Sequence, residues 1–201
     1  MPCGADHPLR FRATGLLLRG ALLCAAGCTP PPTLRDLEPK ADLTVPTRVG
    51  DYRLTERDTI AQEHGGGHVY RFSDGSATRL TVFVYRIPAD VQEGPDSAAW
   101  VHRESEKFTR VLPIQVERGV YEAYEVAFAH AEPDVRGADT IPGHVVGAGT
   151  RRGGEVFVEL QYLYLVRGRF VKVRATIPSD RWQETTVPNF AKALVGSIAP
   201  R

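Results

Sequence analysis

Two histidines lie four residues apart in the segment Glu63-His64-Gly65-Gly66-Gly67-His68. Two imidazoles at this spacing can share a metal ion on one face of a helix, but the three glycines disfavour a helix here. On a glycine-rich loop the pair could still wrap Zn²⁺ or Cu²⁺. A zinc site needs three or four protein ligands, and this segment offers only two imidazoles and one carboxylate. We therefore expect no metal site, and interpret His64 and His68 as solvated residues of a hairpin loop.

A second group of histidine and acidic side chains lies in the polar segment 130–144. Its members are His130, Glu132, Asp134, Asp139 and His144. Carboxylates and imidazoles gathered at the rim of a sheet could form a catalytic or binding site. A loop rich in Asp, Gly and Pro has the same composition without any function. An enzyme would require a titratable pair that converges within hydrogen-bond distance.

Other signatures of catalysis are missing from the sequence. The segment Ser73-Asp74-Gly75-Ser76 lacks the Gly-x-Ser-x-Gly pattern of a nucleophile elbow. The glycines at 65–67 are not followed by Lys and a helix, as a phosphate-binding loop requires. All three cysteines lie within the first 28 residues, so the rest of the chain has no thiol nucleophile. We expect no catalytic residue and no cofactor.

The beginning of the chain has the order of a bacterial secretion signal over residues 1–27, with basic residues, a leucine-rich stretch and then small residues. The segment Leu23-Cys24-Ala25-Ala26-Gly27-Cys28 resembles the lipobox of bacterial lipoproteins. That resemblance implies that Cys28 is acylated and becomes the new N-terminus. Ala25 stands where the family usually has Leu, and Arg19 interrupts the apolar stretch. The alternative is an ordinary cysteine behind a signal that carries no lipid.

Residues 28–48 are predicted to be a flexible tether, because Cys28 is followed by Thr29-Pro30-Pro31-Pro32-Thr33. In a polyproline conformation of ~3.1 Å per residue, such a tether reaches about 60 Å. Residues 49–201 are then expected to form a single domain on the outer side of a bacterial membrane. Thr29 after the cysteine implies, by the same resemblance, the outer membrane of a two-membrane bacterium.

The composition excludes some classes of partner. The 25 basic and 24 acidic residues nearly cancel, which gives a formal net charge of +1. Such a balance has no electrostatic footprint for nucleic acid. The content of hydrophobic residues, 42%, is ordinary for a soluble domain. Contact with a membrane is therefore expected through the lipid, with an envelope protein as a possible partner.

Alternating apolar residues and turn dipeptides predict seven strands. The strands are expected over residues 51–58, 67–73, 79–86, 119–130, 143–151, 155–166 and 169–177. The last two form a hairpin around Arg167-Gly168. On its second strand Val173 is expected to face inward, and the intervening polar residues to face water. These polar residues are Lys172, Arg174 and Thr176.

Two helices are also predicted. The first covers residues 96–112, with Asp96 or Ser97 as its cap and Pro113 as its end. The second is a short closing helix that starts near Pro188. On the first helix His102 and Glu104 are expected on the solvated face. Trp100 and Trp182 are interpreted as anchors at the edge of the core rather than as platforms for a ligand.

The predicted order β-β-β-α-β-β-β-β-α indicates an α+β fold. We expect an antiparallel sheet of about six to seven strands, one helix after the third strand, and a C-terminal helix packed on the sheet. That order resembles the PsbP/Mog1-type fold. The resemblance covers residues 50–199 by element order alone and implies no functional residue.

On function, the sequence favours a lipid-anchored envelope protein with a non-enzymatic binding or accessory domain. Two alternatives stay open. One is a metal-dependent or hydrolytic enzyme built from the scattered His, Asp and Glu residues. The other is a structural protein that holds a partner by its sheet or rim. A large exposed apolar patch or cleft would favour a binding or structural role.

Overall fold

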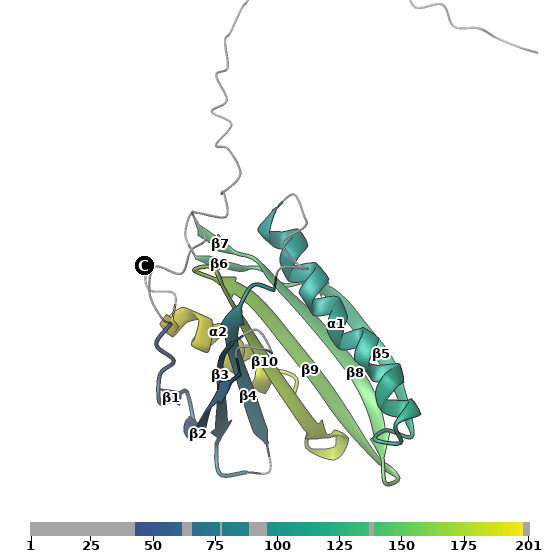
Figure 1. Cartoon of the computed structure of the whole chain (residues 1–201). Coiled ribbons are helices and arrows are strands. Elements are labelled where there is room, and N and C mark those ends of the chain that lie inside the picture. The colour runs from purple at the N-terminus through teal and green to yellow at the C-terminus, as the bar shows by residue number, and fades with distance from the viewer. Residues whose placement is uncertain (1–42, 62–65, 77, 89–95, 137–138, 199–201) are drawn as a thin grey trace, which may run out of the picture. The chain divides into compact units, whose positions relative to one another are not determined.

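The sheet and its two helices are seen in a computed structural model that describes residues 43–61, 66–76, 78–88, 96–136 and 139–198 (Figure 1). The elements before the first helix are β1 (Arg48–Val49), β2 (Tyr52–Ile60), β3 (Gly67–Ser73) and β4 (Arg79–Arg86). Helix α1 (Ser97–Glu117) is followed by β5 (Ala123–Ala131), β6 (Asp134–Arg136), β7 (Asp139–Ile141) and β8 (Gly143–Arg152). The chain ends with β9 (Glu155–Val166), β10 (Arg169–Pro178), the 3-10 turn η3 (Ser179–Arg181) and α2 (Thr186–Ile198).

The main sheet has eight strands in the order β1-β2-β3-β4-β10-β9-β8-β5, and all neighbouring pairs are antiparallel. Its centre is the predicted hairpin of β9 and β10. Arg167 and Gly168 both have positive φ, 49° and 72°, as the tight turn of a hairpin requires. The register of this hairpin sets Gln161 opposite Arg174 and Glu159 opposite Thr176.

Each face of the sheet has its own helix (Figure 1). Helix α2 covers one face, where its apolar residues join the inward residues of β10, such as Val173, in the main core. Helix α1 lies on the other face over β8, β9 and β5. Two smaller clusters form there, one around Trp100 and Phe170 and one around Phe108 and Val146. Because each buried Val, Leu or Phe contributes about 1.5–3 kcal/mol, both helices are held mainly by apolar burial.

The α+β class, the antiparallel sheet and the two helices agree with the prediction, but the strand count of six to seven was too low. The eighth strand of the main sheet is β1, which pairs with β2 over only two residues and is too short for a recognisable pattern. In addition, β6 and β7 form a separate two-stranded sheet inside the segment expected to be a polar loop. Three-residue strands carry too little alternation to be seen in sequence.

Both helices also differ from their predicted bounds. Asp96 caps α1 as expected, since its carboxylate accepts a hydrogen bond from the Ala99 amide at 2.8 Å. The helix does not end before Pro113 but runs through it to Glu117. The last turn is closed at Gly119, whose φ of 70° suits a helix C-terminus and whose amide donates to the Val116 carbonyl at 2.9 Å. Helix α2 begins at Thr186, with Pro188 in its first turn.

The folded part includes residues that were assigned to the tether. Leu43 and Val45 are buried in the main core, and the carbonyl of Thr47 accepts a hydrogen bond from the Leu54 amide at 2.9 Å. The signal segment, Cys28 and the start of the tether lie outside the described residues. In the part of the chain that is described, no helix is long and apolar enough to cross a membrane.

Candidate functional site

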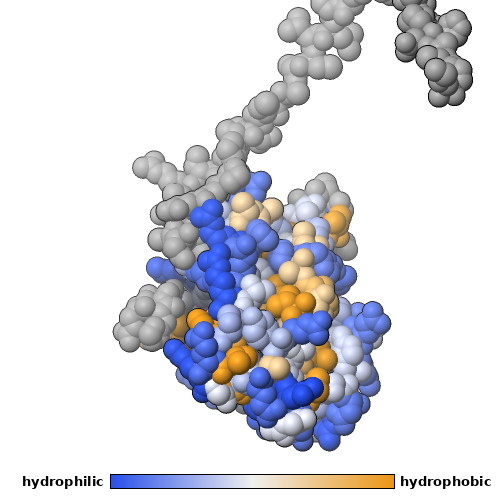
Figure 2. Space-filling model, turned by 90° about the vertical axis from the view of Figure 1, so that its right-hand side faces the viewer, coloured by the Kyte–Doolittle hydropathy of each residue, from blue (hydrophilic) through white to orange (hydrophobic). Residues whose placement is uncertain are grey.

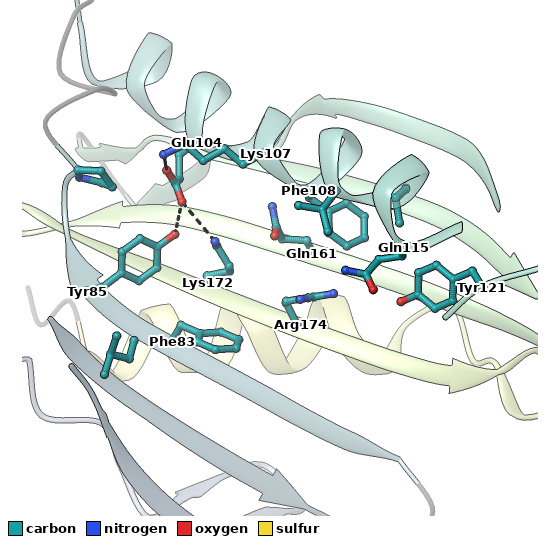
Figure 3. Close-up of a pocket in the computed structure, with 14 residues that line it drawn as sticks. Phe83, Tyr85, Glu104, Lys107, Phe108, Gln115, Tyr121, Gln161, Lys172 and Arg174 are labelled. Carbon is teal, nitrogen blue, oxygen red and sulfur yellow. Dashed lines mark hydrogen bonds and ion pairs between the residues drawn. The ribbon is translucent and has the colours of Figure 1, made fainter. Parts of the chain in front are cut away.

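A cleft of about 710 Å³ lies between α1 and the sheet (Figure 3). It exists because α1 covers β8, β9 and β5 but leaves much of β10 and β4 open on the same face. The helix wall carries Glu104, Lys107, Phe108, Val111 and Gln115. The floor on the sheet carries Phe83, Tyr85, Gln161, Lys172 and Arg174. Its volume is within the usual range for small-molecule sites, about 300–1,000 Å³.

Strand register places the polar floor residues side by side. Lys172 and Arg174 are two apart on β10 and therefore project from the same face. Phe83 of β4 is the partner of Lys172, and Gln161 of β9 is the partner of Arg174. Figure 3 shows Lys172, Gln161 and Arg174 rising from adjacent strands toward the helix.

A buried carboxylate stands at one end of the cleft. Glu104, which is 4% exposed, accepts a hydrogen bond from the Tyr85 hydroxyl at 2.8 Å. The ammonium groups of Lys172 and Lys107 lie 3.3 and 3.0 Å from its two oxygens. Burial is the main cause that raises the pKa of Tyr85 well above its ordinary value, and the nearby Glu104 raises it further. Burial also lowers the pKa of Lys172, although Glu104 opposes that change.

A second buried carboxylate lies beside the floor. Glu159 accepts hydrogen bonds from Thr176 at 2.7 Å and from Tyr121 at 3.2 Å. The Arg174 guanidinium is 4.0 Å from Glu159 and also lies over the ring of Phe108, 5.3 Å from its centroid. Burial, and after it Glu159, raises the pKa of Tyr121. Glu159 is thus held by two hydroxyl donors, with Arg174 beyond hydrogen-bond distance.

One buried donor on the floor has no acceptor. Gln161 is 2% exposed, and its side-chain nitrogen has no hydrogen-bond partner among the described residues. Leaving a buried polar group without a partner costs about 1–3 kcal/mol. Gln161 lines the cleft, but its side-chain nitrogen has almost no exposed surface, so an acceptor on a bound molecule would satisfy it after a turn of the side chain.

The histidine pair at 64 and 68 does not form a described site. His64 lies outside the described residues. His68 lies half-buried on β3, where its ring centroid is 6.0 Å from that of Tyr70. The expectation that His68 is solvated was therefore wrong. Within the described ranges, no group of three His, Cys, Asp or Glu residues could hold a metal ion.

The acidic and histidine residues of 130–144 are not brought together as one set. His130 pairs with Val145 on β8, so these two side chains project from the same face of the sheet. His144 comes just before Val145 in β8 and therefore projects from the opposite face. Glu132 lies 3.2 Å from Lys192, and Asp134 forms an ion pair with Arg136. The side chain of Asp139 lies outside the described part.

His144 instead meets helix α1. Its Nδ1 lies 2.9 Å from the Ser105 hydroxyl, and its Nε2 lies 3.3 Å from Nδ1 of His102. The other ring nitrogen of His102, Nε2, lies 3.6 Å from a carboxylate oxygen of Glu106. Burial lowers the pKa of His144, and His102 and His130 lower it further. Ser105 is fully buried, so no substrate reaches its hydroxyl in this arrangement.

One expectation for α1 and one for β10 need correction. His102 is exposed as predicted, but Glu104 is not on the solvated face; it lies inside the cleft. Lys172 does not face water either, since its side chain is only 18% exposed. The tryptophans agree with the prediction: Trp100 is buried in the cluster under α1, and Trp182 packs partly buried on the main core.

The cleft residues Gln161, Lys172 and Arg174 were missed as a site. One signal was available: the turn at Arg167-Gly168 predicts that Arg174 faces Gln161 across the hairpin. A polar row across two central strands of a sheet is unusual when both faces are expected to carry helices. The sequence does not reveal where α1 lies on the sheet. Because α1 lies beside this row of polar residues, the row becomes the floor of a cleft.

Comparison with known proteins gives a structural likeness. No family model matches the chain, and no curated protein is significantly similar to it. The chain is similar to the solution structure of the cyanobacterial PsbP protein (CyanoP) from Synechocystis sp. PCC 6803. The likeness covers 75% of this chain and 88% of that chain, with 16% identity and a TM-score of 0.45. At this TM-score the likeness carries no argument about family or function.

Proposed function

We propose that this chain is a lipid-anchored envelope protein whose domain binds a small molecule in the cleft between α1 and the sheet, without chemical conversion. The observation that carries the proposal is Gln161, a buried donor that lacks an acceptor and lines a cleft of about 710 Å³. Protein interiors rarely leave such a group unpaired. A bound molecule supplies the missing acceptor.

The proposed anchor is the acylated Cys28, supported by its lipobox-like context and by the proline-rich residues that follow. Acyl chains contribute about 0.8 kcal/mol per buried CH₂ group, so two chains hold a protein at a membrane. The domain then lies on the periplasmic side, with its lipid in the outer membrane of a two-membrane bacterium. A tether of this kind lets the cleft collect ligand near the membrane surface.

A non-enzymatic role fits the groups that meet in the described residues. The hydrogen-bonded chain Ser105–His144–His102 has the order of a hydrolase triad, but its serine is fully buried. In the cleft itself, the two carboxylate oxygens of Glu104 are already engaged by the Tyr85 hydroxyl and by the ammonium groups of two lysines. These contacts favour binding over catalysis.

A second candidate function is partner binding through the edge strand β5. All nine of its residues are exposed, and it lacks Lys, Arg and Pro, which usually protect an edge from pairing. Tyr124, Val126 and Phe128 are among the exposed large hydrophobic residues. Figure 2 shows hydrophobic side chains scattered among hydrophilic ones on this side of the molecule. Val126→Lys should then abolish capture of an envelope partner while leaving the cleft intact.

Native mass spectrometry of the chain purified from membranes tests the proposed binding function. We expect a bound small molecule on the wild-type chain. Val111→Trp, which fills the mouth of the cleft, should remove that molecule. Ile114→Trp is the matched control, because Ile114 is equally exposed on the same helix but does not line the cleft. An identical bound mass in both variants would place the ligand elsewhere.

A further inference from the structure

We propose that the ligand of the cleft is an organic acid, with a single carboxylate held between Gln161, Lys172 and Arg174 and an apolar body along the helix wall. This inference rests on the proposed function and names the class of its ligand. It is carried by three features of the lining: an excess of cations, donors without acceptors, and an apolar wall.

The charges that line the cleft are unequal. Three cationic side chains, Lys107, Lys172 and Arg174, face it, against one carboxylate, Glu104. Lys107 and Lys172 share that carboxylate and Arg174 lies 4.0 Å from Glu159, so these five side chains together carry one net positive charge. A cleft between low-dielectric walls strengthens the field of the remaining positive charge. The lining therefore attracts an anion and repels a cation.

The donors at the floor are in excess over their acceptors. The Lys172 ammonium has three N–H groups; within the described ranges it donates to Glu104 at 3.3 Å and lies 4.9 Å from the centroid of the Tyr85 ring. Arg174 stays 4.0 Å from Glu159, which leaves its guanidinium outside hydrogen-bond distance of that carboxylate. The amide of Gln161, directly across from Arg174, has no acceptor among the described residues. A carboxylate offers only acceptors, so it complements all three groups.

The rest of the lining is apolar. Phe108, Val111 and Leu112 form the helix side, and Phe83, Ile60 and Pro88 lie opposite. Figure 3 shows the rings of Phe83 and Phe108 on the two sides of the polar row. A ligand with an apolar body buries surface against both sides, at about 25 cal/mol per Å².

The buried carboxylates limit the charge of the ligand. Glu104 and Glu159 lie next to the cations that would hold it. A dianion such as a phosphate monoester would bring a second negative charge close to both, which costs energy in a low-dielectric site. A monoanion needs only the excess positive charge that the lining has. A single carboxylate therefore fits better than a phosphate.

Three matched probes test this class: 2-naphthoate, the neutral 2-naphthamide and the cationic 2-naphthylmethylammonium. Their binding is measured by equilibrium dialysis to the full chain in phosphatidylcholine nanodiscs, with empty nanodiscs as the blank. We expect 2-naphthoate to bind at least about tenfold more tightly than the other two. Lys172→Gln and Arg174→Gln should each weaken 2-naphthoate about tenfold and leave 2-naphthamide unchanged. Lys192→Gln, on α2 outside the cleft, should change neither.

Two results would overturn the inference. If all three probes bind equally and Val111→Trp blocks them, the cleft binds molecules but does not select anions, and the proposed function stands. If no probe binds, the ligand class is wrong, and the bound mass on the native chain decides the function separately. Circular dichroism shows whether Lys172→Gln folds. If Lys172→Gln does not fold, Arg174→Gln still tests the inference, because the Arg174 side chain is 41% exposed.

Discussion

The ammonium of Lys172 on β10 lies 3.3 Å from a carboxylate oxygen of Glu104 on α1. This pair connects the helix wall of the cleft to its floor, and both side chains are largely buried. Replacing a buried ion pair by apolar residues is often neutral, but removing one partner costs about 3–5 kcal/mol. Position 172 is therefore structural as well as part of the cleft.

Urea unfolding should show that both faces of β10 matter. Val173→Asp buries a carboxylate in the main core and should lower the free energy of unfolding by more than about 3 kcal/mol. Lys172→Asp places a second carboxylate beside Glu104 and should cost about as much. The control Lys192→Gln removes a half-exposed ion pair and should cost at most about 1 kcal/mol. A small effect of Lys172→Asp would show that the face under α1 is open to water.

Stability should fall in mild acid because of His144. Its pKa is lowered in the folded chain by burial, so the folded state binds fewer protons than the unfolded state, whose histidine titrates near 6.5. The contribution of His144 is thus complete above pH 6.5 and is lost as the pH falls below that value. A protonated His144 would then lie beside His102, whose Nδ1 is 3.3 Å from Nε2 of His144.

Chemical denaturation at pH 7.5 and pH 5 measures this loss. His144→Gln should flatten the dependence between the two pH values, because no proton is then taken up at this position. His130→Gln, which removes an exposed histidine, should largely keep it. A wild-type free energy of unfolding that does not change over this range contradicts the burial of a neutral His144.

The start of the folded domain can be tested by truncation. A chain of residues 43–201 should unfold at higher urea than a chain of residues 49–201. The shorter chain loses Leu43 and Val45 from the main core, which we expect to cost about 2–5 kcal/mol. Leu43→Ala in the longer chain should give part of that loss. Equal midpoints would show that the domain begins at residue 49.

Acylation of Cys28 is tested by fractionation and labelling. Cys28→Ala should leave the membrane fraction and fail to incorporate labelled fatty acid, because the lipid is the proposed anchor. Cys24→Ala, four residues earlier, is the matched control and should remain in the membrane fraction. Retention of Cys28→Ala on membranes in high salt would place the anchor elsewhere.

Much of the sheet could be predicted because its strands are long and bounded by turns. The alternation in residues 169–177 identified the inward side of β10 at Val173, and Gly153-Gly154 and Arg167-Gly168 marked two hairpin turns correctly. Strand β1 was missed because two residues make no pattern. Pro113 was interpreted as a helix end, whereas the helix continues through it to Glu117.

The candidate site could not be predicted in the same way. Alternation shows which residues share a face, but it does not show what covers that face. Lys172 and Glu104 were each assigned to water because charged residues are usually exposed. The tertiary position of α1 brings these two residues together, although they are 68 positions apart in the chain. The same position leaves Gln161 buried but facing a cleft.

The side-chain amide of Gln161 gives the most direct test of binding in the cleft. In a ¹H–¹⁵N spectrum of the chain, an organic extract of envelope membranes should shift the Gln161 side-chain amide pair, because the ligand supplies the acceptor that it lacks. Backbone amides of Tyr124 and Phe128 on β5 should stay in place. Shifts confined to β5, with the Gln161 amide unchanged, would contradict ligand binding in the cleft and favour partner binding at the sheet edge.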